Sequence, residues 1–259
     1  MATETQQHLL VDGTLIEISR DGRHQYWVGD GPKMKGVTSL IGHVDADGFG
    51  AGMGWALKKV RENGGDLEAP RQSAQQAKET GARLHSDIDD HIKTGTIAED
   101  PLFLAWYRGQ KTDANWLGSE RFVINPELEY GGTVDALELL DHGVVIHDWK
   151  TVEPSSWHKY GDTLRKNKDA AQLAAYARAL ERMNSRPKLQ ARGPQLVPTR
   201  GFVTYVLRDG SESFMVEADL ELGWKIFQAS RELTLLMNGN HGASMKRPSQ
   251  EAPTSREDE

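Results

Sequence analysis

Two aspartates and a lysine between residues 131 and 150 are the side chains best suited to chemistry in this chain. Two runs rich in β-branched and aliphatic residues flank Asp141-His142-Gly143, a pattern that predicts a β-hairpin. If the turn is centred near Asp141 and His142, positions whose numbers sum to 283 pair with one another, so Asp135 faces Asp148. Directly opposed side chains of antiparallel strands lie roughly 5 Å apart on one face. Lys150, two residues beyond Asp148, points to that same face.

Two opposed carboxylates are destabilising unless a positive charge lies between them. A hard divalent cation held by oxygen ligands would supply that charge. The alternative is a surface hairpin on which Asp148 and Lys150 form a solvated ion pair, and a bulge at Gly143 would slip the register by one residue. Taken alone, this stretch leaves both interpretations open.

Composition restricts the classes of protein that fit. The chain has 259 residues, of which 37% are hydrophobic and 27% charged, as expected of a globular protein with one large domain or two small ones. The absence of cysteine excludes disulfides, thiolate zinc sites and iron–sulfur clusters, and suits a reducing cytoplasm. We find neither a long apolar run nor a signal peptide, and expect no membrane partner. The net charge of −7 argues against a basic surface overall, although residues 146–188 carry nine Lys or Arg against five acids.

The distribution of elements predicts one α/β domain. Its mixed central β-sheet is flanked by α-helices and carries an N-terminal β-hairpin appendage. We expect the appendage over residues 1–36, the main domain over 37–238 and a disordered polar tail over 239–259. Residues 1–6 are expected to be disordered. A polar connection is expected over 154–168. Strands are predicted over 9–18, 24–28, 120–124, 132–140, 143–149, 201–207 and 213–218. Helices are predicted over 37–41, 55–61, 70–93, 102–116, 169–183 and 219–237.

One predicted helix carries a histidine on its apolar stripe. Gly81, Leu84, Ile88 and Ile92 recur at helical spacing, and His85 lies among them. A lone histidine on an apolar face is usually a core residue with satisfied hydrogen bonds, so this helix alone does not favour a metal ligand. Gly81 costs about 1 kcal/mol in a helix interior, which suggests close packing or close approach of a ligand at that position.

Several spaced signals together resemble the PD-(D/E)xK nuclease superfamily, and in particular its RecB-like exonuclease branch, which includes phage exonucleases and the mitochondrial genome maintenance exonuclease. The signals are His85, then Gly-Thr-Val-Asp135, then Asp148-Trp149-Lys150, and then Gln172 with Tyr176. A bare Asp-x-Lys occurs by chance in most proteins, but its combination with a glycine-flanked Asp and a Gln-x-x-x-Tyr is much more specific. The resemblance covers about residues 81–180.

The resemblance implies a role for each matching residue and a restriction-endonuclease-like fold. His85, Asp135, Asp148 and the backbone carbonyl of Trp149 would bind Mg²⁺ or Mn²⁺. Lys150 would orient or activate the attacking water and stabilise charge at the scissile phosphate, while Gln172 and Tyr176 would hold that lysine or the nucleic acid. Glu120 matches an acidic position that often precedes the second motif, and could equally be an exposed strand residue. The residues expected to contact nucleic acid are Gly132, Trp157, Lys159, Tyr160, Arg165, Lys166 and Lys168. The alternative for residues 157–168 is an ordinary flexible loop.

These roles suit phosphodiester hydrolysis, because a metal lowers the pKa of bound water and a nearby cation stabilises the charge that grows in the transition state. The resulting hypothesis is a stand-alone metal-dependent DNA exonuclease in recombination, repair or phage DNA processing. It would act on linear DNA, with single-stranded ends favoured, in a bacterial or phage-infected cytoplasm. A recombination or single-strand-binding protein is a candidate partner. The alternatives are an endonuclease or flap nuclease with the same site, a nuclease-fold protein that binds DNA without cutting it, and a Schiff-base enzyme that uses Lys150.

Overall fold

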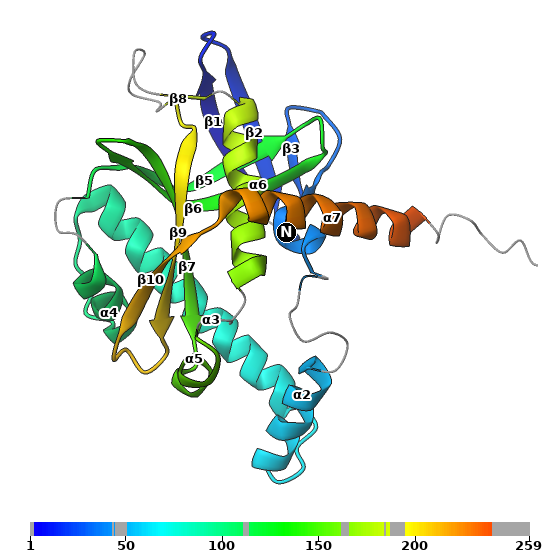
Figure 1. Cartoon of the computed structure of the whole chain (residues 1–259), viewed down its shortest axis with the longest axis vertical. Coiled ribbons are helices and arrows are strands. Elements are labelled where there is room, and N and C mark those ends of the chain that lie inside the picture. Colours follow the sequence, from blue (N-terminus) through cyan, green and yellow to red (C-terminus); the bar gives the residue numbers. More distant parts are fainter. Residues whose placement is uncertain are drawn as a thin grey trace, which may run out of the picture.

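The central feature of the fold is a mixed sheet of six strands with helices on both faces (Figure 1). The computed structural model describes residues 3–42, 44, 51–110, 114–161, 166–183, 185–186 and 195–239. The sheet has the order β10-β9-β7-β6-β4, and β5 pairs with β6. Its strands are β4 (Lys35–Gly36), β5 (Trp116–Asn125), β6 (Tyr130–Leu140), β7 (Gly143–Val152), β9 (Pro198–Leu207) and β10 (Ser213–Ala218). The β4–β6 and β7–β9 pairs are parallel and the others antiparallel, so the predicted α/β class with a mixed, helix-flanked sheet is confirmed.

Seven helices lie within the described residues. They are α1 (Val37–Leu40), α2 (Ala51–Glu62), α3 (Ala69–Thr94), α4 (Pro101–Gly109), α5 (Pro154–Tyr160), α6 (Lys166–Met183) and α7 (Leu220–Gly239). Side chains of α3 and α4, including Leu84 and Trp106, pack with Trp149 on one face of the sheet. Those of α6 and α7, including Leu173 and Phe227, pack on the other. None of these helices combines the length and apolar character needed to cross a membrane.

Six of the buried residues of α6 are alanines. Small side chains let α7 approach its backbone, and a Cβ atom at Gly223 would lie only 2.3 Å from the carbonyl oxygen of Ala170. As a result, polar side chains of α6 are buried against the sheet together with its apolar ones, Asp169 and Gln172 among them.

The N-terminal strands form part of a second, four-stranded sheet of order β3-β2-β1-β8. Its strands are β1 (Thr3–Leu10), β2 (Leu15–Asp21), β3 (Tyr26–Val28) and β8 (Ser185–Arg186). The predicted hairpin is therefore three strands, extended by a fourth from late in the chain. Ile18 and Tyr26 belong to the same buried cluster as Phe122 and Tyr130 of the main sheet, so the predicted boundary at residue 36 falls inside a shared core.

Two predictions for the N-terminal region are wrong. Residues 3–6 are not disordered, because they pair along β2 from Thr3 opposite Asp21 to Gln6 opposite Ile18. The strand predicted over 9–18 is interrupted by a turn. There Asp12 accepts a hydrogen bond from the Thr14 amide at 2.9 Å, and Gly13 takes a left-handed φ of +89°.

Two further predictions are corrected in the middle of the chain. The helix predicted over 102–116 ends at Gly109, and Trp116 instead begins β5, where its ring packs against those of Trp106, His147 and Trp149. The polar connection predicted over 154–168 contains α5 and the first turn of α6. The predicted tail lies outside the described residues from position 240 onwards.

Candidate metal centre

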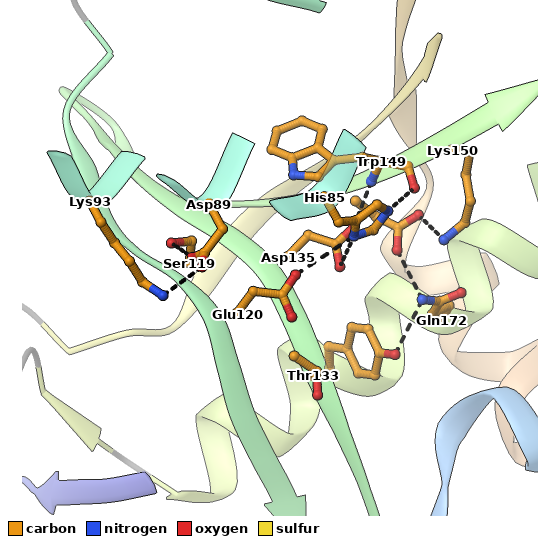
Figure 2. A network of polar contacts seen from close by, with 12 residues as sticks. His85, Asp89, Lys93, Ser119, Glu120, Thr133, Asp135, Trp149, Lys150 and Gln172 are labelled. Atoms are coloured by element: carbon orange, nitrogen blue, oxygen red, sulfur yellow. Dashed lines mark hydrogen bonds and ion pairs between the residues drawn. The ribbon is translucent and has the colours of Figure 1, made fainter. Parts of the chain in front are cut away.

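Five elements bring the predicted site residues together (Figure 2). Helix α3 contributes His85, β6 contributes Asp135, and β7 contributes Asp148 and Lys150, while α6 contributes Gln172. Strand β5 adds Glu120, whose role the sequence left open between a site residue and an exposed strand residue. The structure thus gathers side chains that are widely separated along the chain at one end of the β6–β7 hairpin.

The hairpin register explains part of this arrangement. Ala136 pairs with His147 and Leu137 with Ile146, so paired positions sum to 283 as predicted. Counted from the turn, the last paired residues are Ala136 and His147, and Asp135 is the next residue of β6. There the Asp135 Oδ2 atom accepts a hydrogen bond from the Trp149 amide at 2.7 Å, which fixes the carboxylate against the backbone of β7.

Three potential metal ligands converge on one point. His85 Nδ1 lies 3.6 Å from Asp135 Oδ1 and 3.7 Å from Glu120 Oε1, and one ligand atom from each residue lies within 4.8 Å of the others. The other ring nitrogen, Nε2, lies 3.0 Å from the Trp149 carbonyl oxygen and donates to it. This hydrogen bond orients the imidazole so that Nδ1 faces the two carboxylates, as outer partners do for metal-binding histidines.

The electrostatics of this group suit a cation. Burial disfavours the charged form of His85, but Asp135 and Glu120 outweigh burial and raise the pKa of His85 to about 9. Burial raises the pKa of Asp135, which His85 and Lys150 only partly offset. The imidazole therefore carries a proton at neutral pH and offsets part of the negative charge of the two carboxylates.

Asp148 is the most buried of the predicted ligands. Its Oδ2 atom lies 2.5 Å from Lys150 Nζ, and its Oδ1 atom accepts a hydrogen bond from Gln172 Nε2 at 2.9 Å. Burial, together with the nearby Asp135 carboxylate, raises the pKa of Asp148 to about 6 although Lys150 opposes the rise. Burial opposes the charged form of Lys150, but Asp148 and Asp135 raise the pKa of that ammonium. Asp148, which the resemblance implies to be a metal ligand, is not one of the three residues whose ligand atoms lie within 4.8 Å of one another.

Polar side chains on one face of helix α6 contact three strands of the sheet. Gln172 reaches Asp148 of β7, and Tyr205 of β9 donates to Asp169 at 2.7 Å. The Tyr176 hydroxyl accepts a second hydrogen bond from Gln172 Nε2 at 3.2 Å, and the ring of Tyr176 packs on β6. The resemblance implies that Gln172 and Tyr176 hold Lys150 or the nucleic acid; in the structure Gln172 donates to Asp148, the ion-pair partner of Lys150, and to Tyr176.

Gly132 requires a correction, since it was expected to contact nucleic acid. The residue is buried, and a Cβ atom there would lie 2.1 Å from Cε1 of Tyr176. Glycine is needed at this position to admit the tyrosine ring, so Gly132 supports the site by packing and presents no surface to a substrate.

The other residues expected to bind nucleic acid lie on α5 and at the start of α6. Trp157 is partly buried and stacks on Phe214 with ring centroids 4.6 Å apart, so it serves packing at least in part. Lys159 is exposed on α5, and Tyr160 ends that helix. Lys166 and Lys168 are partly exposed in the first turn of α6. Arg165 lies outside the described residues.

Glu120 is the residue whose importance the sequence understated. It adopts a left-handed φ of +47° in the middle of β5, a conformation that costs about 1–2 kcal/mol for a residue other than glycine. Such strained residues gather at functional sites, where the surrounding structure holds them. No local sequence signal marks this kink, because glutamate has no preference for it.

The donor set fits a divalent cation. An imidazole nitrogen and two carboxylates are ligands used for first-row divalent metals such as Mn²⁺, and the carboxylates also suit Mg²⁺. Around them, three carboxylates face one ammonium and one imidazole. Once the imidazole loses its proton, the group carries an excess of two negative charges, which one divalent cation would neutralise.

Comparison with known proteins adds little to this picture. No protein-family model matches the chain, and no curated protein matches it. A solved structure described as the crystal structure of SSO0001 is similar at 14% sequence identity and a TM-score of 0.35, over 76% of this chain and 74% of that one.

Proposed function

We propose that this chain is a divalent-metal-dependent DNA exonuclease with a restriction-endonuclease-like fold, which hydrolyses phosphodiester bonds from the ends of linear DNA. The observation that carries the proposal is the convergence of His85, Glu120 and Asp135 beside the buried Asp148–Lys150 pair. Two carboxylates and an imidazole next to an ammonium suit metal-assisted hydrolysis of a phosphodiester, and the order of these residues along the chain resembles that of RecB-like nucleases.

In this proposal His85 Nδ1, Glu120 and Asp135 hold the metal, and the Asp148 carboxylate, each of whose oxygens can accept more than one partner, joins them. The bound metal would supply a nucleophilic hydroxide at neutral pH and stabilise negative charge on the phosphate. Lys150, whose side chain is 25% exposed, is the cation of the group that can turn toward a substrate phosphate. Gln172 holds the Asp148 carboxylate in place.

The site also explains why the proposal favours hydrolysis over chemistry at Lys150 itself. A Schiff-base lysine needs a lowered pKa, so that its amine is neutral and nucleophilic. The carboxylates around Lys150 raise its pKa instead, which keeps it a cation. Trapping with borohydride in the presence of a carbonyl substrate should therefore give no adduct.

The direct test is degradation of end-labelled single- and double-stranded linear DNA by the purified protein, with Mg²⁺, Mn²⁺ or a chelator. Metal-dependent release of labelled nucleotides is expected. Asp148→Asn and Lys150→Met should abolish hydrolysis while leaving DNA binding in place, and Lys225→Met, at an exposed lysine of α7, is the matched control. Equal activity in the two site variants and the wild type would refute the assignment.

A covalently closed circle separates the exonuclease from the endonuclease that would use the same site. Cutting of the circle would replace the exonuclease proposal with an endonuclease or flap nuclease. Binding of DNA without hydrolysis under either metal would point to a non-cleaving DNA-binding protein. A recombination or single-strand-binding protein remains the partner that we propose for the active enzyme.

A further inference from the structure

The kink at Glu120 changes which face of β5 its side chain reaches. Successive side chains of a regular strand point to opposite faces of the sheet. Here two consecutive residues reach the same helix, because Ser119 donates to Asp89 of α3 at 2.5 Å and Glu120 lies beside His85 of α3 (Figure 2). The left-handed φ of Glu120 accounts for this break in alternation, so the metal-binding position of Glu120 depends on that backbone conformation.

A side chain from the N-terminal sheet holds this backbone conformation. Gln6 of β1 donates from Nε2 to the Glu120 carbonyl oxygen at 2.6 Å, and its Oε1 atom accepts from the Phe122 amide at 2.9 Å. One carboxamide thus makes the two hydrogen bonds that a neighbouring strand would make along this edge of β5. The opposite edge is held by β6, through the pairs of Ser119 with Ala136 and of Arg121 with Val134.

We propose that Gln6 is a positioning residue for the metal centre, acting through the backbone of Glu120. The inference rests on the proposed function only in assigning a metal to the His85, Glu120 and Asp135 cluster. The hydrogen bonds of the Gln6 carboxamide go to backbone atoms of β5 and not to the three ligand side chains, and Gln6 lies outside the region that resembles a nuclease. Gln6 holds the strained backbone of Glu120 in the conformation that brings the Glu120 carboxylate to His85 and Asp135.

A purely structural role for Gln6 makes a different prediction. If its amide only fastened the two sheets together, its loss would lower the stability of the fold and leave the affinity for metal unchanged. If it positions Glu120, its loss lowers the affinity, and does so only while Glu120 has a carboxylate to position. A double-mutant cycle separates these cases.

The experiment is calorimetric titration of the metal-free protein with Mn²⁺, in the absence of DNA, for Gln6→Ala alone and combined with Glu120→Ala. Loss of a residue that orients a ligand typically weakens metal binding by about 10- to 100-fold, which is the expectation for Gln6→Ala. In the Glu120→Ala background the same change should alter the affinity by less than about twofold, because no carboxylate is left for Gln6 to position; two independent residues would instead give the same loss in both backgrounds.

Gln7→Ala is the matched control, since it removes the same side chain from the adjacent, exposed position of β1. It should bind Mn²⁺ as the wild type does. Gln6→Glu is a second variant that keeps an acceptor for the Phe122 amide but sets an oxygen against the Glu120 carbonyl, and it should weaken binding at least as much as Gln6→Ala. Urea unfolding of each variant establishes that the protein is folded under the conditions of the titration.

The outcomes separate this inference from the proposed function. Wild-type affinity in Gln6→Ala, or an equal loss with and without the Glu120 carboxylate, overturns the role of Gln6 even if DNA is degraded. Conversely, a Gln6-dependent Mn²⁺ site in a protein that degrades no DNA supports the inference and removes the nuclease. A wild-type protein that binds no Mn²⁺ overturns both.

Discussion

Replacing Gly132 with alanine tests whether β6 and α6 are in contact at the site. A Cβ atom at this position would lie 2.1 Å from Cε1, 2.8 Å from Cδ1 and 3.0 Å from Cζ of the Tyr176 ring. Carbon atoms at van der Waals contact are separated by about 3.5–4.0 Å, so the ring must move by more than an ångström or the strand must shift. The ring is buried between α6 and the sheet, which leaves it little room to do so.

The expected loss of stability follows from this overlap. Adding a methyl group to a well-packed core typically costs about 1–3 kcal/mol, and the depth of this overlap places Gly132→Ala at about 3 kcal/mol. That is a large part of the about 5–15 kcal/mol by which folded domains are stable. For a chain of this size it corresponds to a fall of about 6–12 °C in the melting temperature.

Gly81→Ala is the matched control, because it makes the same chemical change on another element of the site. A Cβ atom at Gly81 would meet only the Thr151 hydroxyl oxygen, at 3.8 Å, which is ordinary contact. Since glycine in a helix interior costs about 0.5–1 kcal/mol relative to alanine, Gly81→Ala should stabilise the protein by that amount. The space at Gly81 also means that close packing does not explain its presence in α3.

Urea unfolding followed by circular dichroism measures both variants on one scale. The midpoint should fall for Gly132→Ala and rise for Gly81→Ala, with the denaturant slope unchanged. A Gly132→Ala protein as stable as the wild type would refute the packing of Tyr176 on β6, and with it the account of why a glycine is needed there.

Three further predictions concern the charges of the metal centre. Mn²⁺ affinity measured by calorimetry should rise by about 10- to 100-fold between pH 7 and pH 9. The reason is that His85, whose pKa is raised to about 9, must lose a proton before it binds metal. Equal affinities at the two pH values would contradict the assignment of His85 as a ligand. Glu120→Gly should raise the free energy of unfolding of the metal-free protein by about 1 kcal/mol, because glycine adopts the left-handed backbone conformation without strain. The same change should weaken Mn²⁺ binding. A variant less stable than the wild type in urea would count against strain at this position. Lys150→Met leaves Asp148 buried without its cation and should cost about 3–5 kcal/mol at pH 8. Without Lys150 to oppose the rise, the pKa of Asp148 in the folded variant lies above the wild-type value of about 6, so the variant takes up this proton at a higher pH than the wild type. The deficit should therefore shrink as the pH falls from 8 toward 6 and stay level below it, and a deficit independent of pH over that range in urea melts would refute this account.

The sequence predicted the parts of the site that follow from regular secondary structure. A hairpin has one register once its turn is located, which was enough to align Asp135 with the start of the Asp148–Lys150 segment. Helical spacing placed His85 on the inward face of α3, and Gln172 and Tyr176 one turn apart on α6. These relationships depend on neighbours in the chain, whose geometry a repeating pattern reveals.

The remaining parts depend on contacts between distant segments. Gln6 meets Glu120 across 114 positions, and nothing in the polar N-terminal sequence distinguishes that glutamine from Gln7. The reason for Gly132 lies in a tyrosine of another element, so the sequence indicated a close approach without identifying what approaches. The extent of β5 was missed because Trp116 is specified by aromatic neighbours on α4 and β7, and not by alternation within the strand.

Because β1 pairs with β8, the four-stranded sheet cannot be completed until β8 has been synthesised. Leu9 lies opposite Arg186, so the first strand of the chain gains its second neighbour only after most of the sequence has left the ribosome. Contacts between such distant positions form slowly, because a long loop must close before they contribute stability. His85, Glu120 and Asp135 all emerge before that strand does. A nascent chain therefore carries its candidate metal ligands before the sheet that braces one of them is complete.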